Sequence, residues 1–289
     1  MRCFVCLEKG GMTDACPCTT SVHALCLGKF LGRGFRPRCP TCFAPFTTSA
    51  LVGATEAIYA AVPTMVNLLE LASLRSTVGL PLQALDLLKG AAPEPEHAMA
   101  YNVETAHALL VMGKSQRALC ILGRTLAVLF AMESPGARVF VHALILTAQA
   151  HMHQGEHQLA EGALTVALNI ASDGDLPPDD CLDIMDSIKN MHAAQGDVKR
   201  NLAALLTIYQ ITKVAEKDPF IIAKAHAEWL LASVKAHSES AEVAAPYFAQ
   251  DIKILRRRSP SDELLLKLGS ALGGRPSKRL RQKSHPEDA

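Results

Sequence analysis

Apolar residues recur at helical spacing through most of this chain. In two clear stretches they stand three or four positions apart, as expected for helices that bury one face. The first stretch contains Leu159, Leu164, Ala167, Leu168 and Ala171, and the second contains Leu202, Leu205, Leu206 and Tyr209. The stretch from Val139 to Gly155 is more apolar, but three histidines interrupt it. It therefore predicts a buried amphipathic helix and not a segment that crosses a membrane.

A short turn repeats along this helical region. The turns begin at Gly79, Gly113, Gly155, Gly196 and Ser238, and are therefore 34, 42, 41 and 42 residues apart. The residue five positions after each start is small in most rows, and these residues are Ala84, Ala118, Ala160, Asn201 and Val243. Small residues at fixed places let paired helices approach closely, and stacked pairs bury a core that no single pair could form.

Turn residues also mark the connections between the predicted pairs, at 133–136, 173–178 and 217–219. The whole pattern predicts an all-α solenoid of helical hairpins over residues 79–270. A helical linker or the first helices of the solenoid are expected before it, over residues 47–78. An irregular helical domain is the alternative.

These repeats resemble tetratricopeptide repeats (TPRs), in particular the longer version of about 42 residues found in kinesin light chains. The best match runs from Leu146 to Ala171 and places small residues at motif positions, namely Ala148, Gly155, Ala160 and Ala167. The resemblance implies a curved surface that binds peptides or other proteins, and it implies no chemistry of its own.

Four histidines cluster near the middle of the chain, at His142, His151, His153 and His157. His153 and His157 could share a helix face, as in zinc proteases. However, the glycine-marked turn at 154–156 lies between them and should end the helix there. No glycine-rich phosphate loop or nucleophile elbow occurs either, so no catalytic residue is predicted in the helical region.

Composition and charge refine this picture. The chain has 289 residues, of which 49% are hydrophobic and 20% charged, so most of it can bury a core. The N-terminus lacks an apolar signal segment, and a cytosolic or nuclear protein is expected. Lys and Arg number six against two Asp and Glu in residues 1–46, 14 against 22 in 47–255, and nine against four in 256–289. The acidic surplus of the middle indicates a solvated face, with an interaction surface for basic peptides as the alternative.

Seven of the nine cysteines fall within the first 42 residues. In a reducing compartment such a cluster indicates a metal site before it indicates disulfides. The ligand pairs are Cys3-x2-Cys6, Cys16-x1-Cys18, His23-x2-Cys26 and Cys39-x2-Cys42. Eight ligands complete two tetrahedral zinc sites with no vacant position, so the two Zn²⁺ ions should be structural. The other two cysteines, Cys120 and Cys181, are expected to be small buried residues.

The spacing alone does not fix which pairs share a zinc ion. A sequential arrangement joins the first two pairs, Cys3 with Cys6 and Cys16 with Cys18. An interleaved arrangement joins the first pair with the third, and the second pair with the fourth. Interleaving suits a segment of about 45 residues, which is too small to be held by a hydrophobic core alone.

The ligand order resembles the RING-CH, or RING-variant, zinc finger of ubiquitin ligases. The matching motifs are Cys16-Pro-Cys18-Thr19, Ser21, Val22-His23-Ala-Leu-Cys26-Leu27, Phe30 where Trp is usual, and Cys39-Pro40-Thr41-Cys42. The gap of four residues between Cys18 and His23 is shorter than the family's usual seven. The resemblance covers residues 1–46 and implies an interleaved, cross-braced module. In it, Cys3, Cys6, His23 and Cys26 hold the first zinc, and Cys16, Cys18, Cys39 and Cys42 hold the second.

The resemblance also implies a function. RING fingers dock a ubiquitin-conjugating enzyme in a shallow apolar groove, which here would comprise Val5, Phe30, Leu31 and Pro40. No side chain of the finger is catalytic, because the finger acts by positioning. The chain is thus predicted to be a soluble RING-type ubiquitin-protein ligase whose helical repeats bind the protein or peptide substrate.

Two other functions remain open at this stage. Active RING fingers often carry Arg or Lys directly after the last ligand, where this chain has Phe43, which cannot donate a hydrogen bond from its side chain. A non-catalytic adaptor with the same two parts is therefore the first alternative. The ligand order also resembles the PHD finger, a reader of histone tails, but Pro37 stands where a PHD finger has an aromatic residue.

The C-terminal residues 271–289 are predicted to form a basic, disordered tail. Basic residues cluster at Arg256–Arg258 and again at 278–283. Such runs are typical of nuclear-import signals, of nucleic-acid contacts or of solvated tails without function. No aromatic residue is interleaved to stack on bases, so nucleic acid is not expected as a partner, and neither is a membrane.

Overall fold

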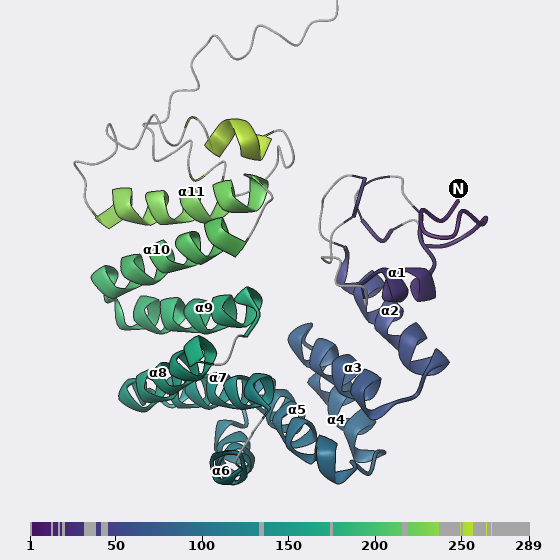
Figure 1. The fold of residues 1–289 in the computed structure, drawn as a ribbon, viewed down its shortest axis with the longest axis horizontal. Helices are drawn as coiled ribbons and strands as arrows, with labels where there is room; N and C mark the ends of the chain where they lie inside the picture. The colour runs from purple at the N-terminus through teal and green to yellow at the C-terminus, as the bar shows by residue number, and fades with distance from the viewer. Residues whose placement is uncertain are drawn as a thin grey trace, which may run out of the picture. The chain divides into compact units, whose positions relative to one another are not determined.

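The computed structural model describes most of the chain (Figure 1). The described residues are 2–12, 14–16, 18, 21–31, 39–41, 46–132, 136–173, 176–215, 219–236, 249, 251–256, 264 and 267. They form two compact units, Met1–Met191 and His192–Ala289. Each unit has its own core and is described by itself.

The N-terminal part of the first unit is a small cysteine-rich module, and those of its residues that the structure describes form little regular secondary structure. Three isolated β-bridges tie its segments together, between Arg2 and Lys9, Cys3 and Ser21, and Met12 and Val22. One short helix follows, α1 (Ala24–Leu31), and it packs against α2 (Thr48–Ala61). The core of the module combines sulfur-bearing and apolar side chains with the start of α2: Cys3, Ala15, Cys16, Val22, Leu27, Cys39, Phe46, Ala50 and Ala54.

Antiparallel helical hairpins make up the rest of the first unit. Within each hairpin the two helices pack together, and the first helices of successive hairpins also pack together, α3 with α5 and α5 with α7. The elements are α3 (Met65–Thr77), α4 (Pro81–Lys89), the 3-10 turn η1 (Pro95–His97), α5 (Ala98–Val111), α6 (Ser115–Ala131), α7 (Ala137–His153), α8 (His157–Asp173) and α9 (Pro178–Gln195). The predicted buried helix at 139–155 is α7, which ends two residues before Gly155.

The four glycines that the repeat analysis singled out each follow the end of a helix, namely α3, α5, α7 and α9. Gly79, Gly113, Gly155 and Gly196 have φ angles of 82°, 73°, 77° and 69°, in the left-handed region that favours glycine. At each turn the glycine N–H donates to the carbonyl three residues back, and the next N–H donates to the carbonyl five residues back, as Glu156 does to His151 at 2.9 Å. This is the Schellman motif, and it explains why the turn recurs with the repeat.

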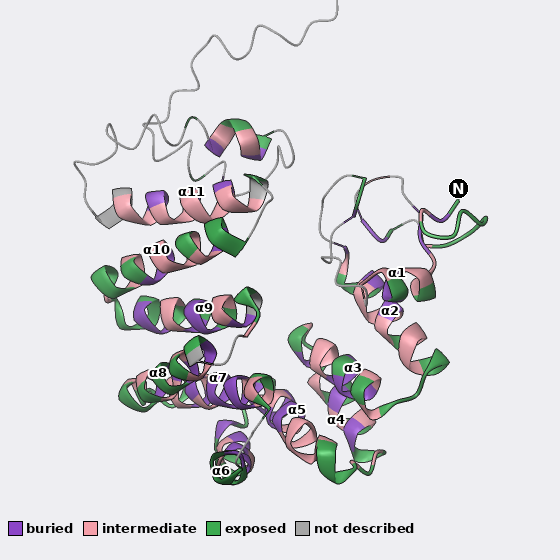
Figure 2. Ribbon diagram, in the orientation of Figure 1, coloured by how far each residue is buried: buried purple, intermediate pink, exposed green. Residues whose placement is uncertain are grey.

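The main core of the first unit lies between these hairpins. It is centred on α7, of which eight residues are buried, and it extends from Val103 on α5 to Met191 on α9 (Figure 2). The small residues predicted at the helix crossings, Ala84, Ala118 and Ala160, have no exposed surface. Asn201 is half-buried, and the fifth row, with Ser238 and Val243, lies outside the described residues. The prediction of stacked helical hairpins is confirmed.

The second unit has a separate core. Its helices are α10 (Val198–Ala215) and α11 (Pro219–Ala236), which pack together, and residues 251–256 are also helical. The side chains of Ala223, Ala227, Leu230, Leu231, Leu255 and Leu264 form the buried cluster. A hydrogen bond joins His226 to the buried Asp251, with 2.8 Å between Nδ1 and Oδ2.

One expectation about cysteine was wrong. Cys120 is exposed, because the buried face of α6 carries Ala118, Leu122, Thr125 and Leu129, and Cys120 lies on the opposite face. Cys181 is half-buried. In the part of the chain that the structure describes, no helix is both long enough and apolar enough to cross a membrane. The tail at 271–289 and its basic cluster lie outside the described residues.

Candidate metal centre

The structure brings the described ligand residues of the N-terminal module into two groups. In the first, the ligand atoms of Cys3, Cys6, His23 and Cys26 all lie within 4.8 Å of one another. The Sγ atom of Cys6 is 3.3 Å from Nδ1 of His23, and that of Cys26 is 3.8 Å from the same nitrogen. Cys3 and Cys6 flank a tight turn, whereas His23 and Cys26 stand at the start of α1.

The second group contains three described cysteines, Cys16, Cys18 and Cys39, whose sulfur atoms also lie within 4.8 Å of one another. The distance from Cys18 Sγ is 3.1 Å to Cys16 Sγ and 3.6 Å to Cys39 Sγ. The fourth predicted member, Cys42, lies outside the described residues. Among the two arrangements that spacing left open, this grouping corresponds to the interleaved one, since Cys3 and Cys6 are grouped with His23 and Cys26 instead of Cys16 and Cys18.

The residues fit a tetrahedral metal ion. Zinc–sulfur bonds of about 2.3 Å in a tetrahedron require sulfur atoms roughly 3.8 Å apart. The two sulfur–sulfur separations in the second group, 3.1 and 3.6 Å, are within about 0.7 Å of this value. Thiolate with imidazole is also the donor set that zinc prefers in structural sites. Two backbone N–H groups donate hydrogen bonds to the sulfurs. Val5 N lies 3.4 Å from Cys3 Sγ, and Thr41 N lies 3.4 Å from Cys39 Sγ. The two groups could therefore hold metal ions.

Electrostatics within the first group also favours a cation. Burial alone would raise the pKa of the Cys3 thiol, but hydrogen bonds from the backbone of Cys6, His23 and Val5 lower it to about 6. Burial and the neighbouring sulfurs of Cys6 and Cys3 raise the pKa of Cys26 to about 11. The thiol of Cys3 therefore ionises readily to a thiolate. The thiol of Cys26 beside it resists ionisation unless a positive ion is present.

The four residues of the predicted apolar groove differ in exposure. Val5 is 39% exposed and Pro40 is also exposed. Phe30 and Leu31 are half-buried against the core of the module, and the Phe30 ring packs edge-on against Phe4 at 5.7 Å. Val5 and Pro40 are thus the more exposed of the four, whereas Phe30 and Leu31 contribute mainly to the core of the module.

Sequence analysis missed two exposed apolar residues beside the ligands. Leu7 follows Cys6, is 68% exposed and has a φ angle of 65°, which is unusual for a residue with a branched side chain. Leu25, between His23 and Cys26, is exposed as well. The available signal was their position, because apolar residues next to metal ligands cannot all turn inward in so small a module. Phe43 lies outside the described residues.

Comparisons with known proteins bear on the helical part of the chain. No protein-family model matches the chain, and no curated protein matches it. Two similar crystal structures are of a Podosopora anserina protein described as a kinesin light chain with nearly identical TPR-like repeats, one of them a single-substitution variant. Each is 20% identical in sequence to this chain. The alignments cover 67% of this chain and 95% or 96% of the solved chains, with TM-scores of 0.50 and 0.51. The helical part thus has a TPR-like fold, as predicted.

Proposed function

We propose that this chain is a RING-type ubiquitin-protein ligase with a protein-binding repeat domain. In this proposal the module at 1–46 holds two zinc ions and recruits a ubiquitin-conjugating enzyme, and the repeats at 79–270 bind the substrate. The observation that carries the proposal is the interleaved grouping of the ligand residues. Each group draws on two segments that are distant in sequence, which is how a short segment is braced without a large core.

The chemistry would be positional. Zinc, when bound, would act as a structural ion that fixes the two cysteine turns and leaves no open position for water. Val5 and Pro40 would then present exposed apolar surface to the conjugating enzyme, with Leu7 and Leu25 extending it. A lysine amine of the substrate attacks the ubiquitin thioester on the conjugating enzyme, forms an amide bond and releases the enzyme's thiol. The finger would favour the geometry in which this attack occurs.

A ubiquitin-discharge assay tests this function. The zinc-loaded full chain is mixed with a panel of ubiquitin-loaded conjugating enzymes, and loss of the thioester to free lysine is timed. Val5→Ala and Pro40→Ala should each slow discharge about tenfold, as expected for central residues of an interface. Val62→Ala and Pro63→Ala are matched controls on exposed positions after α2, and both should discharge at the native rate.

A non-catalytic adaptor is the second candidate, and one residue favours it. Phe43 has no side-chain donor where active RING fingers often place Arg or Lys. If the native chain shows no discharge but Phe43→Arg restores it, the adaptor replaces the ligase. If every variant is silent with both zinc ions bound, the ligase is rejected. Binding of an unmodified histone tail by the module would then point to a PHD-type reader.

A further inference from the structure

A cavity of about 540 Å³ lies on the first helices of successive hairpins, far in sequence from the cysteine module. Residues of α3, α5, α7 and α9 line it, together with His97 of η1. Its inner wall is apolar and is made by side chains that include Leu69, Val103, Val141 and Ile145. All of the residues that line the cavity belong to the first unit. The cavity is large enough for one long side chain and the adjoining backbone of a peptide.

The charged residues of this cavity are mostly acidic. Four carboxylates line it, Glu70, Glu104, Asp180 and Asp183, against the single guanidinium of Arg138. Three histidines, His97, His107 and His142, also line it. The acidic surplus of the middle of the chain, which sequence alone assigned to a solvated face, is therefore partly gathered in a hollow. A hollow lined by one sign of charge attracts ligands of the opposite sign.

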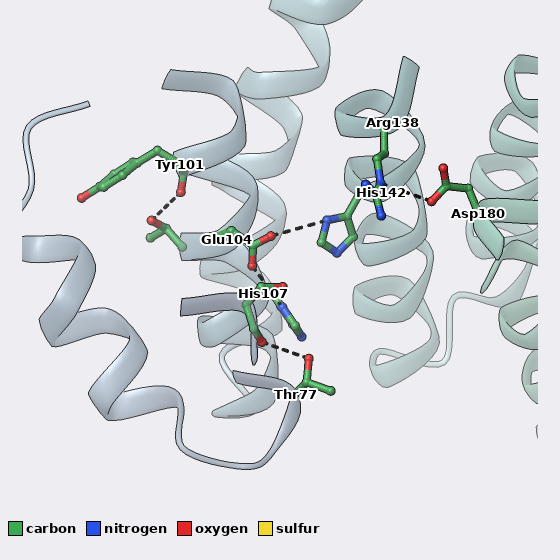
Figure 3. Close-up of polar contacts among 9 residues, drawn as sticks. Thr77, Tyr101, Glu104, His107, Arg138, His142 and Asp180 are labelled. Atoms are coloured by element: carbon green, nitrogen blue, oxygen red, sulfur yellow. Dashed lines mark hydrogen bonds and ion pairs between the residues drawn. The ribbon is translucent and has the colours of Figure 1, made fainter. Parts of the chain in front are cut away.

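Glu104 is the buried carboxylate of this cavity, with 8% of its surface exposed. Figure 3 shows it between two imidazole rings. Its Oε2 atom is 3.4 Å from Nδ1 of His107, and its Oε1 atom is 3.6 Å from Nδ1 of His142. Burial lowers the pKa of His142 more than the nearby Glu104 raises it. At pH 7 this imidazole therefore brings little positive charge to Glu104.

Asp180 provides the second observation, which is independent of the first. Its Oδ1 atom is 3.4 Å from Nε of Arg138, but its Oδ2 atom is buried and has no hydrogen-bond partner (Figure 3). The residue is 8% exposed, whereas the Arg138 side chain is 81% exposed, so their pairing is weak. A buried carboxylate oxygen without a partner is costly. The arrangement is explained if a ligand supplies the missing donor.

We propose that this cavity binds a lysine side chain of a protein or peptide partner. The aliphatic stem would lie along the apolar wall, and the ammonium group would donate to the carboxylate of Asp180. Lysine fits better than arginine, because a guanidinium binds best to a carboxylate that offers both oxygens. Each buried carboxylate here already has an oxygen directed at another group, Asp180 at Arg138 and Glu104 at two imidazoles.

This inference deepens the proposed function, since it rests on the repeats binding a protein partner, but it does not depend on ligase activity. The test uses the zinc-loaded full chain and three small probes: N-acetyl-lysine methylamide, its arginine counterpart and its Nε-acetylated form. Imidazole NMR signals of His107 and His142 are followed during titration. The lysine probe should give saturable shifts, the arginine probe should bind at least several-fold more weakly, and the acetylated probe should give none.

Asp180→Asn should weaken the lysine response about tenfold, because it removes the charge and keeps the shape. Asp86→Asn, an exposed carboxylate on α4, is the matched control and should leave the response unchanged. If Asp180→Asn does not fold, the comparison of the three probes on the native chain still decides. No saturable shift, or equal shifts from all three probes, overturns the proposal. Lysine binding without ubiquitin discharge would reject the ligase alone, and discharge without lysine binding would reject the cavity alone.

Discussion

Gly28 of α1 lies directly against Ile58 of α2. A Cβ atom built at Gly28 would stand 2.4 Å from Cγ1 of Ile58 and 2.9 Å from the carbonyl oxygen of Ala54. Neither distance is tolerated by real Cβ atoms, so the two helices can approach this closely only because position 28 has no side chain. The contact joins the cysteine-rich module to the first long helix, α2.

Gly28→Ala should therefore destabilise the module. The Ile58 side chain could rotate away, but the backbone oxygen of Ala54 could not, so we expect a loss of about 1–3 kcal/mol in the free energy of unfolding. Urea denaturation followed by circular dichroism measures it. The matched control is Gly53→Ala in α2, where nothing lies within 4 Å of the new methyl group. That change should be neutral or stabilise the helix by up to about 1 kcal/mol.

Replacing a turn glycine should also be costly. Gly155→Ala places a side chain at a φ angle of 77°, and we expect a loss of about 1–2 kcal/mol in the free energy of unfolding. Gly162→Ala, in the interior of α8 with open space around it, should instead be stabilising. Thermal or urea unfolding of both variants gives the comparison. Equal effects from the two changes would contradict the Schellman role of Gly155.

Metal content is the direct check on the ligand groups. Native mass spectrometry should find two zinc ions per chain, and Cys39→Ala should lower this number to one. Removal of zinc with a chelator should unfold the module and leave most of the helical signal, because the hairpins have their own core. Cys120→Ala, a change at an exposed cysteine of α6, should keep both ions. Fewer than two ions in the native chain would reject the ligand assignment itself.

Stability should depend on pH through His142. Burial in the cavity lowers its pKa from the ordinary 6.5, so on acidification the unfolded chain takes up this proton before the folded chain does. The free energy of unfolding should therefore fall as the pH drops from 7 to 5, and His142→Gln should flatten this part of the dependence. Urea denaturation at several pH values measures both curves. The other ionisable groups that line the same cavity are Glu70, His97, Glu104, His107, Arg138, Asp180 and Asp183.

A steeper fall in the variant would contradict the assignment to His142. An imidazole that gains an ion pair on folding would have the opposite effect on the pH dependence of stability. Its pKa would be raised, and the folded protein would become more stable in acid. Glu104 does favour the charged form of His142, but the loss of solvent around the ring outweighs it. The measured change of the free energy of unfolding with pH thus shows whether burial or the charge of Glu104 has the larger effect on the pKa of His142.

The hairpins could be predicted because each depends on local signals that recur. In the hairpin of α7 and α8, a glycine with positive φ ends the first helix and a fully buried alanine follows five residues later, and both are visible in the sequence as Gly155 and Ala160. The exposure of Cys120 was missed because the prediction rested on its residue type. The buried face of the helix is defined by the spacing of residues such as Ala118 and Leu122, and Cys120 does not lie on that face. A residue type alone does not determine burial.

The cysteine groups and the cavity were predictable to different degrees. Ligand types and spacing indicated two metal sites, but spacing could not decide between sequential and interleaved pairing, because either arrangement supplies two complete sets of four ligands. The cavity was not predicted at all. Glu104 and Asp180 are 76 positions apart, and only the stacking of α5, α7 and α9 places them around one hollow. The net charge of a segment does not reveal that its acidic residues lie around one cavity.

The exposed position of Cys120 on α6 has a practical consequence. In the half-buried Cys181, burial raises the pKa and the charge of Asp180 adds to it, so this thiol is seldom ionised at neutral pH. The cysteines of the module would be shielded by bound zinc, since coordinated thiolates react slowly. A maleimide dye added to the zinc-loaded chain should therefore attach first at Cys120. That single label would give fluorescence experiments a fixed reference point on the repeat domain without disturbing either the module or the cavity.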